Sequence, residues 1–210
     1  KMPGKSWSTS AWETCPGARN PDGSPVSACE FCYALTGAYN YPGTIAARKH
    51  NEKDWQKAGW VAAMVKAIGK AKYFRWFDSG DVYSPMLAGK IWAVIVETPN
   101  CQHWLPTRAY KDPAILYHLK RIARLRNAVV RYSSDSREGG RLDFGINSTI
   151  IQSAEDFIPE KGYSLCRSGE RGGKCGSCRA CWSKAVKTGA YVHHGNKVSP
   201  KKFEKDLLSV

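Results

Sequence analysis

The chain has 210 residues and a net charge of +14, because 32 lysines and arginines stand against 18 acidic residues. No apolar run approaches the roughly 20 residues of a transmembrane helix, and no signal-peptide pattern is visible, which argues against a membrane-spanning or a secreted protein. We therefore expect a cytoplasmic protein whose thiols stay reduced and able to bind metal. The positive field favours nucleic acid as a partner; the alternative is that the charge lies on solvated helix faces.

The first part of the chain, residues 1–42, is rich in Gly, Pro, Ser and Asn and predicts an irregular loop segment. After it, spaced apolar residues over 44–69 predict one or two amphipathic helices. Strands and helices then alternate, which is typical of βα units. The predicted strands are 73–77, 103–105, 128–132 and 148–152, and the predicted helices begin near Ser84 and Asp112.

The C-terminal part has a different pattern. From about Gly162 the alternation gives way to a Gly-, Arg- and Cys-rich loop, and a basic tail follows with a short amphipathic helix predicted near 200–208. We predict an α/β fold, in which a parallel sheet resembling a partial (βα) barrel carries a cysteine-rich loop at each end. The predicted domains are a partial barrel over 1–163 and a cluster-binding C-terminal extension over 164–210.

Three consecutive predicted strands end in short polar clusters. The clusters are 78–81, 107–108 and 133–135. Parallel α/β sheets gather their active sites at the carboxyl ends of the strands, so we expect these clusters to converge. The candidate catalytic residues are Asp78, Asp81 and Arg108. The alternatives are structural: either aspartate caps a turn or helix, and Arg108 forms a salt bridge to one of them.

Arg75 lies among aromatic residues within a predicted strand. A buried guanidinium is costly without an opposite charge, so we expect Arg75 to pair with a carboxylate.

Seven of the eight cysteines form two groups with the spacing of metal ligands. The first cysteine group is Cys15, Cys29 and Cys32, and the second cysteine group is Cys166, Cys175, Cys178 and Cys181. A cysteine at every third position brings several sulfurs to one face of a tight loop, which favours a four-iron four-sulfur cluster over a single ion. Zinc is the alternative, because four cysteines suffice for it, and a disulfide framework is a further one.

The two groups differ in their number of ligands. Three cysteines fill three corners of a cubane cluster, so the first group either leaves one iron open or takes a fourth ligand from elsewhere. The second group has four cysteines of its own. The number of cysteines is compatible with one cluster or with two. The eighth cysteine, Cys101, stands alone in an apolar stretch and is expected to be a small buried side chain.

Five motifs that span most of the chain resemble the phage gene-product-88 family. They are Cys-Pro-Gly at 15–17, Cys-x-x-Cys-Tyr-Ala at 29–34, Phe-Arg-Trp-Phe-Asp-Ser-Gly-Asp at 74–81, Trp-Leu-Pro-Thr-Arg at 104–108 and Cys-Gly-Ser-Cys-Arg-Ala-Cys-Trp at 175–182. The resemblance implies a phage-encoded protein that acts in the cytoplasm of the host cell.

The layout is also similar, more distantly, to a shortened radical S-adenosylmethionine barrel. That resemblance implies a catalytic cluster on the first cysteine group, and Phe31 fits the aromatic residue that precedes the last cysteine in that superfamily. The S-adenosylmethionine site that it implies consists of Ser79, Gly80 and Asp81. Thirteen residues lie between Cys15 and Cys29, however, where the superfamily has three.

Three hypotheses follow. The first is a phage-derived iron–sulfur protein with one or two four-iron four-sulfur clusters in a redox or structural role, for which nucleic acid and a redox protein are the expected partners. The second is a radical S-adenosylmethionine-like enzyme. The third is a zinc-stabilised nucleic-acid-binding module. None of them involves a membrane.

Overall fold

A parallel β-sheet organises the computed structural model of the chain, which describes residues 2–204. Within that range the sheet has seven strands in the order β1-β2-β3-β4-β5-β7-β6, and every pairing is parallel. The α/β fold with a parallel sheet is therefore confirmed. The strands are β1 (Lys5–Trp7), β2 (Tyr73–Trp76), β3 (Gln102–Thr107), β4 (Ala128–Ser133), β5 (Ile146–Ile151), β6 (Tyr163–Cys166) and β7 (Thr188–Val192).

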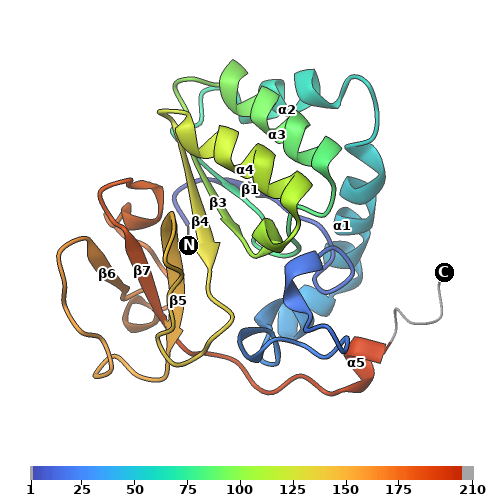
Figure 1. Cartoon of the computed structure of the whole chain (residues 1–210). Helices are drawn as coiled ribbons and strands as arrows, with labels where there is room; N and C mark the ends of the chain where they lie inside the picture. Colours follow the sequence, from blue (N-terminus) through green and yellow to red (C-terminus); the bar gives the residue numbers. More distant parts are fainter. Residues whose placement is uncertain (1, 205–210) are drawn as a thin grey trace.

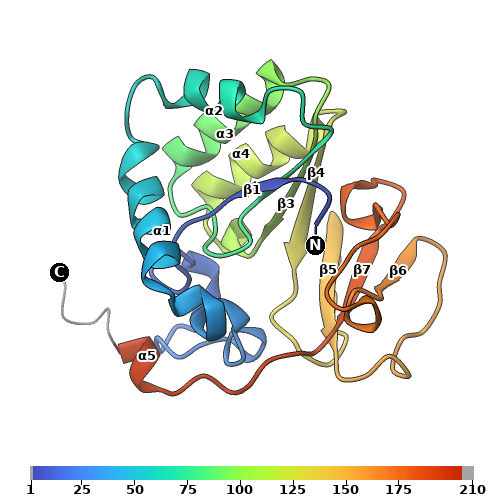
Figure 2. The same cartoon turned by 180° about the vertical axis from the view of Figure 1, so that it is seen from behind.

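The helices lie mainly on one side of this sheet. They are α1 (Pro42–Asp54), α2 (Trp60–Ile68), α3 (Pro85–Glu97), α4 (Pro113–Arg124) and α5 (Lys201–Glu204). Figures 1 and 2 show α2, α3 and α4 side by side over β1 to β4, while β5, β7 and β6 extend beyond them. We call the side covered by these helices the helix face and the opposite side the inner face. The predicted helices over 44–69 correspond to α1 and α2, and the helix predicted over 200–208 is described only as far as α5.

Local sequence signals set where the helices begin. The Asp112 carboxylate accepts hydrogen bonds from the backbone N–H groups of Ala114 and Ile115, and Pro113 occupies the first turn of α4, where no N–H is needed. The Ser84 hydroxyl accepts from the N–H of Met86 and caps α3. The alternative that Asp81 caps this helix is therefore wrong.

The core fills the space between the helices and β1 to β4. Alternation along β2 directs Phe74 and Trp76 into this core, and Trp76 is fully buried. The imidazole of His103 is buried beside them, where its Nδ1 accepts from Trp76 Nε1 at 3.2 Å and its Nε2 lies 2.9 Å from the Thr98 hydroxyl. Burial lowers the pKa of His103 to about 4, so this ring is a neutral core residue.

The C-terminal segment adds strands to the sheet and also covers its inner face. β5 pairs with β7 and β7 with β6, and neither strand after β5 has the apolar periodicity that would have predicted it. The Trp182 side chain packs on Tyr73 and Trp104, and its Nε1 donates to the carbonyl of Phe74 at 3.0 Å. The boundary at 163/164 stays a prediction. Within residues 2–204, no helix has the length and apolar character that crossing a membrane requires.

Candidate metal centres

The first cysteine group lies in a chain of short 3-10 turns near the N-terminus. Cys15 precedes the turn Pro16–Ala18, Cys29 ends the turn Ser27–Cys29, and Cys32 precedes the turn Tyr33–Leu35. The three thiols are free and close enough to influence one another electrostatically. Burial raises the pKa of Cys15, with smaller contributions from Asp81 and the other two thiols, and burial followed by Cys29 raises the pKa of Cys32 to about 11. The fold thus gathers the first cysteine group.

This loop is fastened to the carboxyl ends of three neighbouring strands. Its hydrogen bonds run from Asp81 N after β2 to Thr14 O (3.0 Å), from Lys111 Nζ after β3 to Gly17 O (2.9 Å), and from Ala28 N to Asp135 O after β4 (2.8 Å). A Cβ at position 17 would lie 2.0 Å from the carbonyl oxygen of Arg108, so only glycine allows the two backbones to come this close. The polar strand ends therefore do converge, and they converge beneath the first cysteine group.

Arg108 links this site to the strand ends. Its Nε and Nη2 donate to the carbonyl of Ser134 at 3.1 and 2.8 Å, and its Nε lies 3.6 Å from the Asp135 carboxylate. Arg108 therefore forms its ion pair with Asp135. The predicted alternative, a salt bridge from Arg108 to Asp78 or Asp81, is wrong. Burial raises the pKa of Cys29, while the positive charge of Arg108 acts in the opposite direction.

Asp81 is bonded within the protein. It is 6% exposed, one carboxylate oxygen accepts from the N–H of Val82 at 2.7 Å, and the other accepts from the N–H of Arg108 at 2.7 Å. Burial raises the pKa of Asp81 to about 6, although hydrogen bonds from Thr107 and from these two amides oppose the shift. Asp81 therefore connects the ends of β2 and β3.

The neighbours of Asp81 also contact the N-terminal segment. The hydroxyl of Ser79 donates to the carbonyl of Thr9 at 2.6 Å, and a Cβ at Gly80 would lie 2.1 Å from the Thr9 hydroxyl oxygen. The Asp78 carboxylate accepts from the Ser8 hydroxyl. These contacts fasten residues 8–14 over the turn. A catalytic role for Asp78, Asp81 and Arg108, and an S-adenosylmethionine site at 79–81, stay predictions.

The second cysteine group is brought together only in part. Cys166 ends β6 and pairs in register with Tyr191 of β7, whose hydroxyl lies 3.3 Å from the sulfur of Cys181. Cys166 and Cys181 influence each other electrostatically. Cys175 and Cys178 lie in the intervening loop, where the N–H of Cys178 donates to the carbonyl of Cys175 at 3.1 Å. The thiols that the structure brings together are thus Cys166 and Cys181.

All eight thiols are free, so a disulfide framework does not hold this fold together. In the part of the chain that the structure describes, no three His, Cys, Asp or Glu side chains are placed so that one metal ion could bind them. Cys101 is 1% exposed in the core, as expected for a small apolar side chain.

Two arginines on the inner face were not predicted as parts of a site. Arg131 is 0% exposed, and its guanidinium donates to the carbonyls of Ala180 (2.7 Å), Cys181 (3.1 Å) and Ser183 (3.1 Å). It thereby holds the end of the second cysteine loop against β4. The signal was visible as the one charged residue in the strand Ala-Val-Val-Arg-Tyr-Ser.

Arg75 is the second of these arginines. It donates to the carbonyl of Phe77 at 3.2 Å and to the hydroxyl of Tyr33 at 3.3 Å, and its guanidinium lies 4.5 Å from the ring centre of Trp104. Among residues 2–204 it has no carboxylate within ion-pair distance, so the predicted carboxylate partner is wrong. Neutral oxygens and an aromatic ring take that place, Asp78 acts on Arg75 only from beyond ion-pair distance, and the positive charge of Arg75 also acts on Cys181.

Comparison with known proteins agrees with the motifs. The sequence model of the family described as Gene product 88 matches residues 1–184, so the chain belongs to that family. Neither the curated proteins nor the solved structures include a significant match.

Proposed function

We propose that this member of the gene product 88 family is an iron–sulfur protein, with a four-iron four-sulfur cluster on the first cysteine group and a second cluster on the second cysteine group. The observation that carries the proposal is the convergence of three free thiols over the carboxyl ends of β2, β3 and β4. The cysteines of both groups offer sulfur donors, which suit iron–sulfur clusters. When bound, a cluster of this kind would supply one-electron redox chemistry or structural support.

The cationic side chains near the thiols favour binding of a negatively charged cluster with its thiolate ligands. Metal binding requires thiolates, and burial raises the pKa of Cys15, Cys29 and Cys32, so cationic neighbours are needed to offset the negative charge. Arg108 and Lys111 act on Cys29 in this sense. For the second group, Arg131 and Arg75 have the same effect on Cys181. Each group therefore lies beside two cationic side chains.

The first group has three cysteines, so a cubane cluster there would need a fourth ligand from elsewhere in the protein. Asp135 follows β4; its Oδ1 accepts no hydrogen bond within residues 2–204 but lies 3.6 Å from Arg108 Nε, and its Oδ2 lies 2.7 Å from Lys111 Nζ. It lies close enough to Cys29 to affect the pKa of that thiol. We infer that Asp135 is the candidate fourth ligand, and that without it one iron would be open to substrate.

Metal analysis after purification without oxygen tests the proposal. We expect a brown protein with about four iron and four sulfide per cluster, and loss of iron in Cys29→Ser and in Cys178→Ser. Cys101→Ser is the matched control and should keep its iron, because Cys101 lies in the helix-face core. A colourless protein with stoichiometric zinc would refute the proposal and favour the zinc-stabilised module.

The second candidate function is a radical S-adenosylmethionine-like enzyme. It is favoured by the position of the first cysteine group at the carboxyl ends of parallel strands, next to Gly80 and Asp81. The packing of Thr9 against Gly80 argues against an open cosubstrate site there. We expect the reduced protein not to cleave S-adenosylmethionine. Formation of 5′-deoxyadenosine that is lost in Cys32→Ser would instead establish the enzyme.

A further inference from the structure

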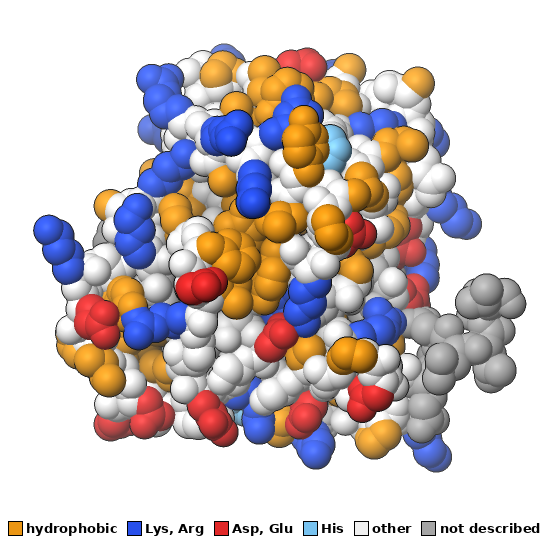
Figure 3. Space-filling model, in the orientation of Figure 1, with side chains coloured by type: hydrophobic (Ala, Val, Ile, Leu, Met, Phe, Trp, Pro, Cys, Tyr) orange, Lys and Arg blue, Asp and Glu red, His pale blue; other side chains and the backbone are white. Residues whose placement is uncertain are grey.

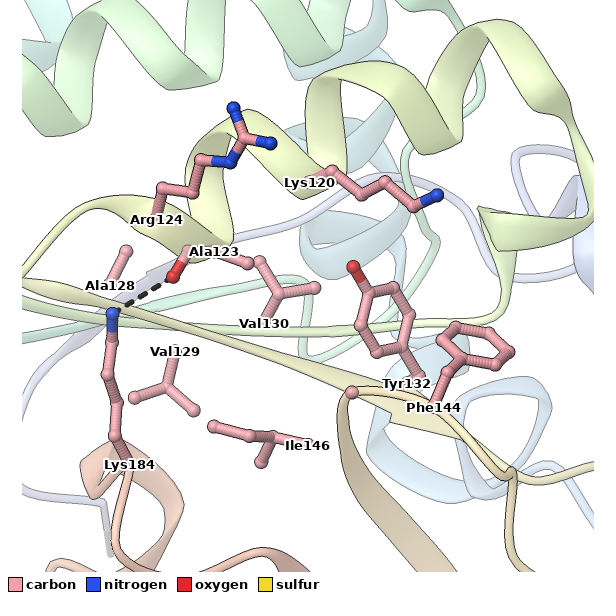
Figure 4. A pocket seen from close by; sticks show the side chains of 11 residues that line it. Lys120, Ala123, Arg124, Ala128, Val129, Val130, Tyr132, Phe144, Ile146 and Lys184 are labelled. Carbon is pink, nitrogen blue, oxygen red and sulfur yellow. Dashed lines mark hydrogen bonds between the residues drawn. The ribbon is translucent and has the colours of Figure 1, made fainter.

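A hollow opens on the helix face where the helix layer ends. It has a volume of about 360 Å³ and lies between α4, β4 and the start of β5. Figure 4 shows that its wall is mainly apolar, and Figure 3 shows an apolar patch in the middle of this side of the molecule. The apolar side chains are those of Val129, Val130, Phe144 and Ile146, together with the ring of Tyr132.

The hollow exists because the chain passes from β4 to β5 without a helix. Residues 134–145 form turns and irregular backbone, so the next position beside α4 is not filled. Gly145, at φ +69°, lets the chain enter β5 directly against the ring of Tyr132, where a Cβ would lie 2.5 Å from Cδ2 and Cε2 of that ring. Tyr132 and Phe144 pack with their ring centres 5.0 Å apart and form one wall. The hollow is thus shaped by the fold itself.

A polar group points into this apolar space. Tyr132 as a residue is 4% exposed, and its hydroxyl has no protein hydrogen-bond partner within residues 2–204 and is accessible to solvent at the hollow. Figure 4 shows this hydroxyl directed toward α4, on the side that carries Lys120. A ligand oxygen in the hollow could replace water as the hydrogen-bond partner of this hydroxyl.

Cationic side chains border the same side of the hollow. Lys120 and Arg124 line it from α4, and Lys184 donates to the carbonyls of Ala123 and Leu125 at the end of that helix. In the described range none of the three forms an ion pair, and the lining includes no acidic residue. Lys and Arg side chains lie above the apolar patch in Figure 3, and acidic side chains lie below it.

We propose that this hollow binds a small amphipathic anion, with its carboxylate or phosphate group at Lys120, Arg124 and the Tyr132 hydroxyl and its apolar body against Phe144 and Ile146. The volume lies in the range of small-molecule sites, which are mostly apolar with a few polar groups that orient the ligand. Lys184 borders the hollow and follows Cys181 by three residues, but the side chains proposed to hold the head group belong to α4 and β4, so the proposed contacts include no cysteine.

NMR titration of the full chain with octanoate, octyl phosphate and 1-octanol tests the proposal. The anions should bind at least about tenfold more tightly than the alcohol, because a charge-assisted hydrogen bond contributes about 1.5–3 kcal/mol. The signals of residues 129–132 and 144–146 should shift. The comparison of octanoate with octyl phosphate identifies the preferred head group.

Variants of the residues that line the hollow test whether octanoate binds there. K120E/R124E should weaken octanoate binding about tenfold, and I146W should abolish it by filling the space. The matched control is K66E/K70E, which reverses two exposed lysines at the same spacing on another part of the helix face and changes the net charge equally. Y132F retains the ring and should weaken binding by several-fold. Thermal unfolding of each variant verifies that it is folded.

Three results would overturn the proposal. If K66E/K70E weakens octanoate binding as much as K120E/R124E, the effect comes from the net charge of the protein and not from this hollow. If 1-octanol binds as tightly as octanoate, the anionic head group is not recognised. A dimer in sedimentation experiments that I146W converts to monomer would show that a second copy of the chain covers this face.

Discussion

The two cysteine groups are held in the fold in opposite ways. The loop of the first group is joined by backbone and side-chain hydrogen bonds to the ends of β2, β3 and β4, and none of its cysteines is fully exposed. The loop of the second group is fastened at its ends, by β6 on one side and by Arg131 and Trp182 on the other, while Cys178 between them is exposed. If both groups bind clusters as proposed, the first loop should change little on binding and the second should become more ordered.

The C-terminal tail strengthens this contrast. It returns from β7 to the first cysteine loop, where the N–H of Val198 donates to the carbonyl of Glu30 at 2.8 Å and Phe203 packs on Trp12. The tail therefore closes the first site rather than the second. A cluster in the first site should be shielded from solvent, and a cluster in the second should be more accessible to a redox partner.

The largest expected effect is at Arg131, which anchors the second loop. Arg131→Met should lower the free energy of unfolding by about 3 kcal/mol or more, because it leaves buried carbonyls without a donor. It should also reduce iron at the second group while iron at the first group is retained. Denaturant unfolding and metal analysis measure both. Equal loss of iron from the two groups would contradict their independence.

His103 provides a test in the helix-face core, which includes no residue of either cysteine loop. Its pKa of about 4 in the folded protein lies below the usual value of about 6.5, so between these values the unfolded chain binds more protons. Stability should therefore fall as the pH drops from about 6.5 to 4, by about 3 kcal/mol at most.

His103→Gln should flatten this dependence in urea unfolding curves recorded across that range. His50→Gln is the matched control, since the His50 side chain is 68% exposed. An unchanged slope in His103→Gln would show that groups in the loops, rather than the core, control acid unfolding.

Glycine substitutions compare the two loops directly. Gly17→Ala should cost about 2 kcal/mol and loosen the first loop, because its Cβ would collide with the backbone at Arg108. Gly169→Ala in the second loop meets nothing within 4 Å and should change stability by less than about 0.5 kcal/mol. Thermal unfolding and limited proteolysis of the two variants provide the comparison. Similar costs would mean that the second loop is as tightly packed as the first.

The smallest effect on the fold is expected from reversing charges in the tail. If the basic surface binds nucleic acid, affinity should fall steeply between roughly 50 and 200 mM salt and show little sequence preference. Replacing Lys197, Lys201 and Lys202 by Glu should then weaken binding uniformly without changing iron content. Unchanged DNA retention in the triple variant would assign the charge of this tail to solubility.

Much of the architecture could be predicted from local patterns. The apolar strands at 73–77 and 128–132 and the capped helix after Asp112 were found because each has a periodic run or a cap within a few residues. The strands β1, β6 and β7 were missed, since they have three to five residues and depend on pairing with distant neighbours. The carboxylate partner predicted for Arg75 was also wrong, because most of its actual partners come from distant parts of the chain. A carbonyl, a phenol and an aromatic ring contact the guanidinium, and the spacing of residues in the sequence does not predict such contacts.

The sequence by itself determined the family, the βα alternation and the two groups of closely spaced cysteines, because motifs, periodicity and spacing are properties of neighbouring residues. Only the tertiary structure decided that the first cysteine group lies over the strand ends, that Arg131 holds the second loop, and that the helix layer stops after α4 and leaves a hollow. These features arise from contacts between residues far apart in the chain, and such contacts form only when the sheet brings those residues together.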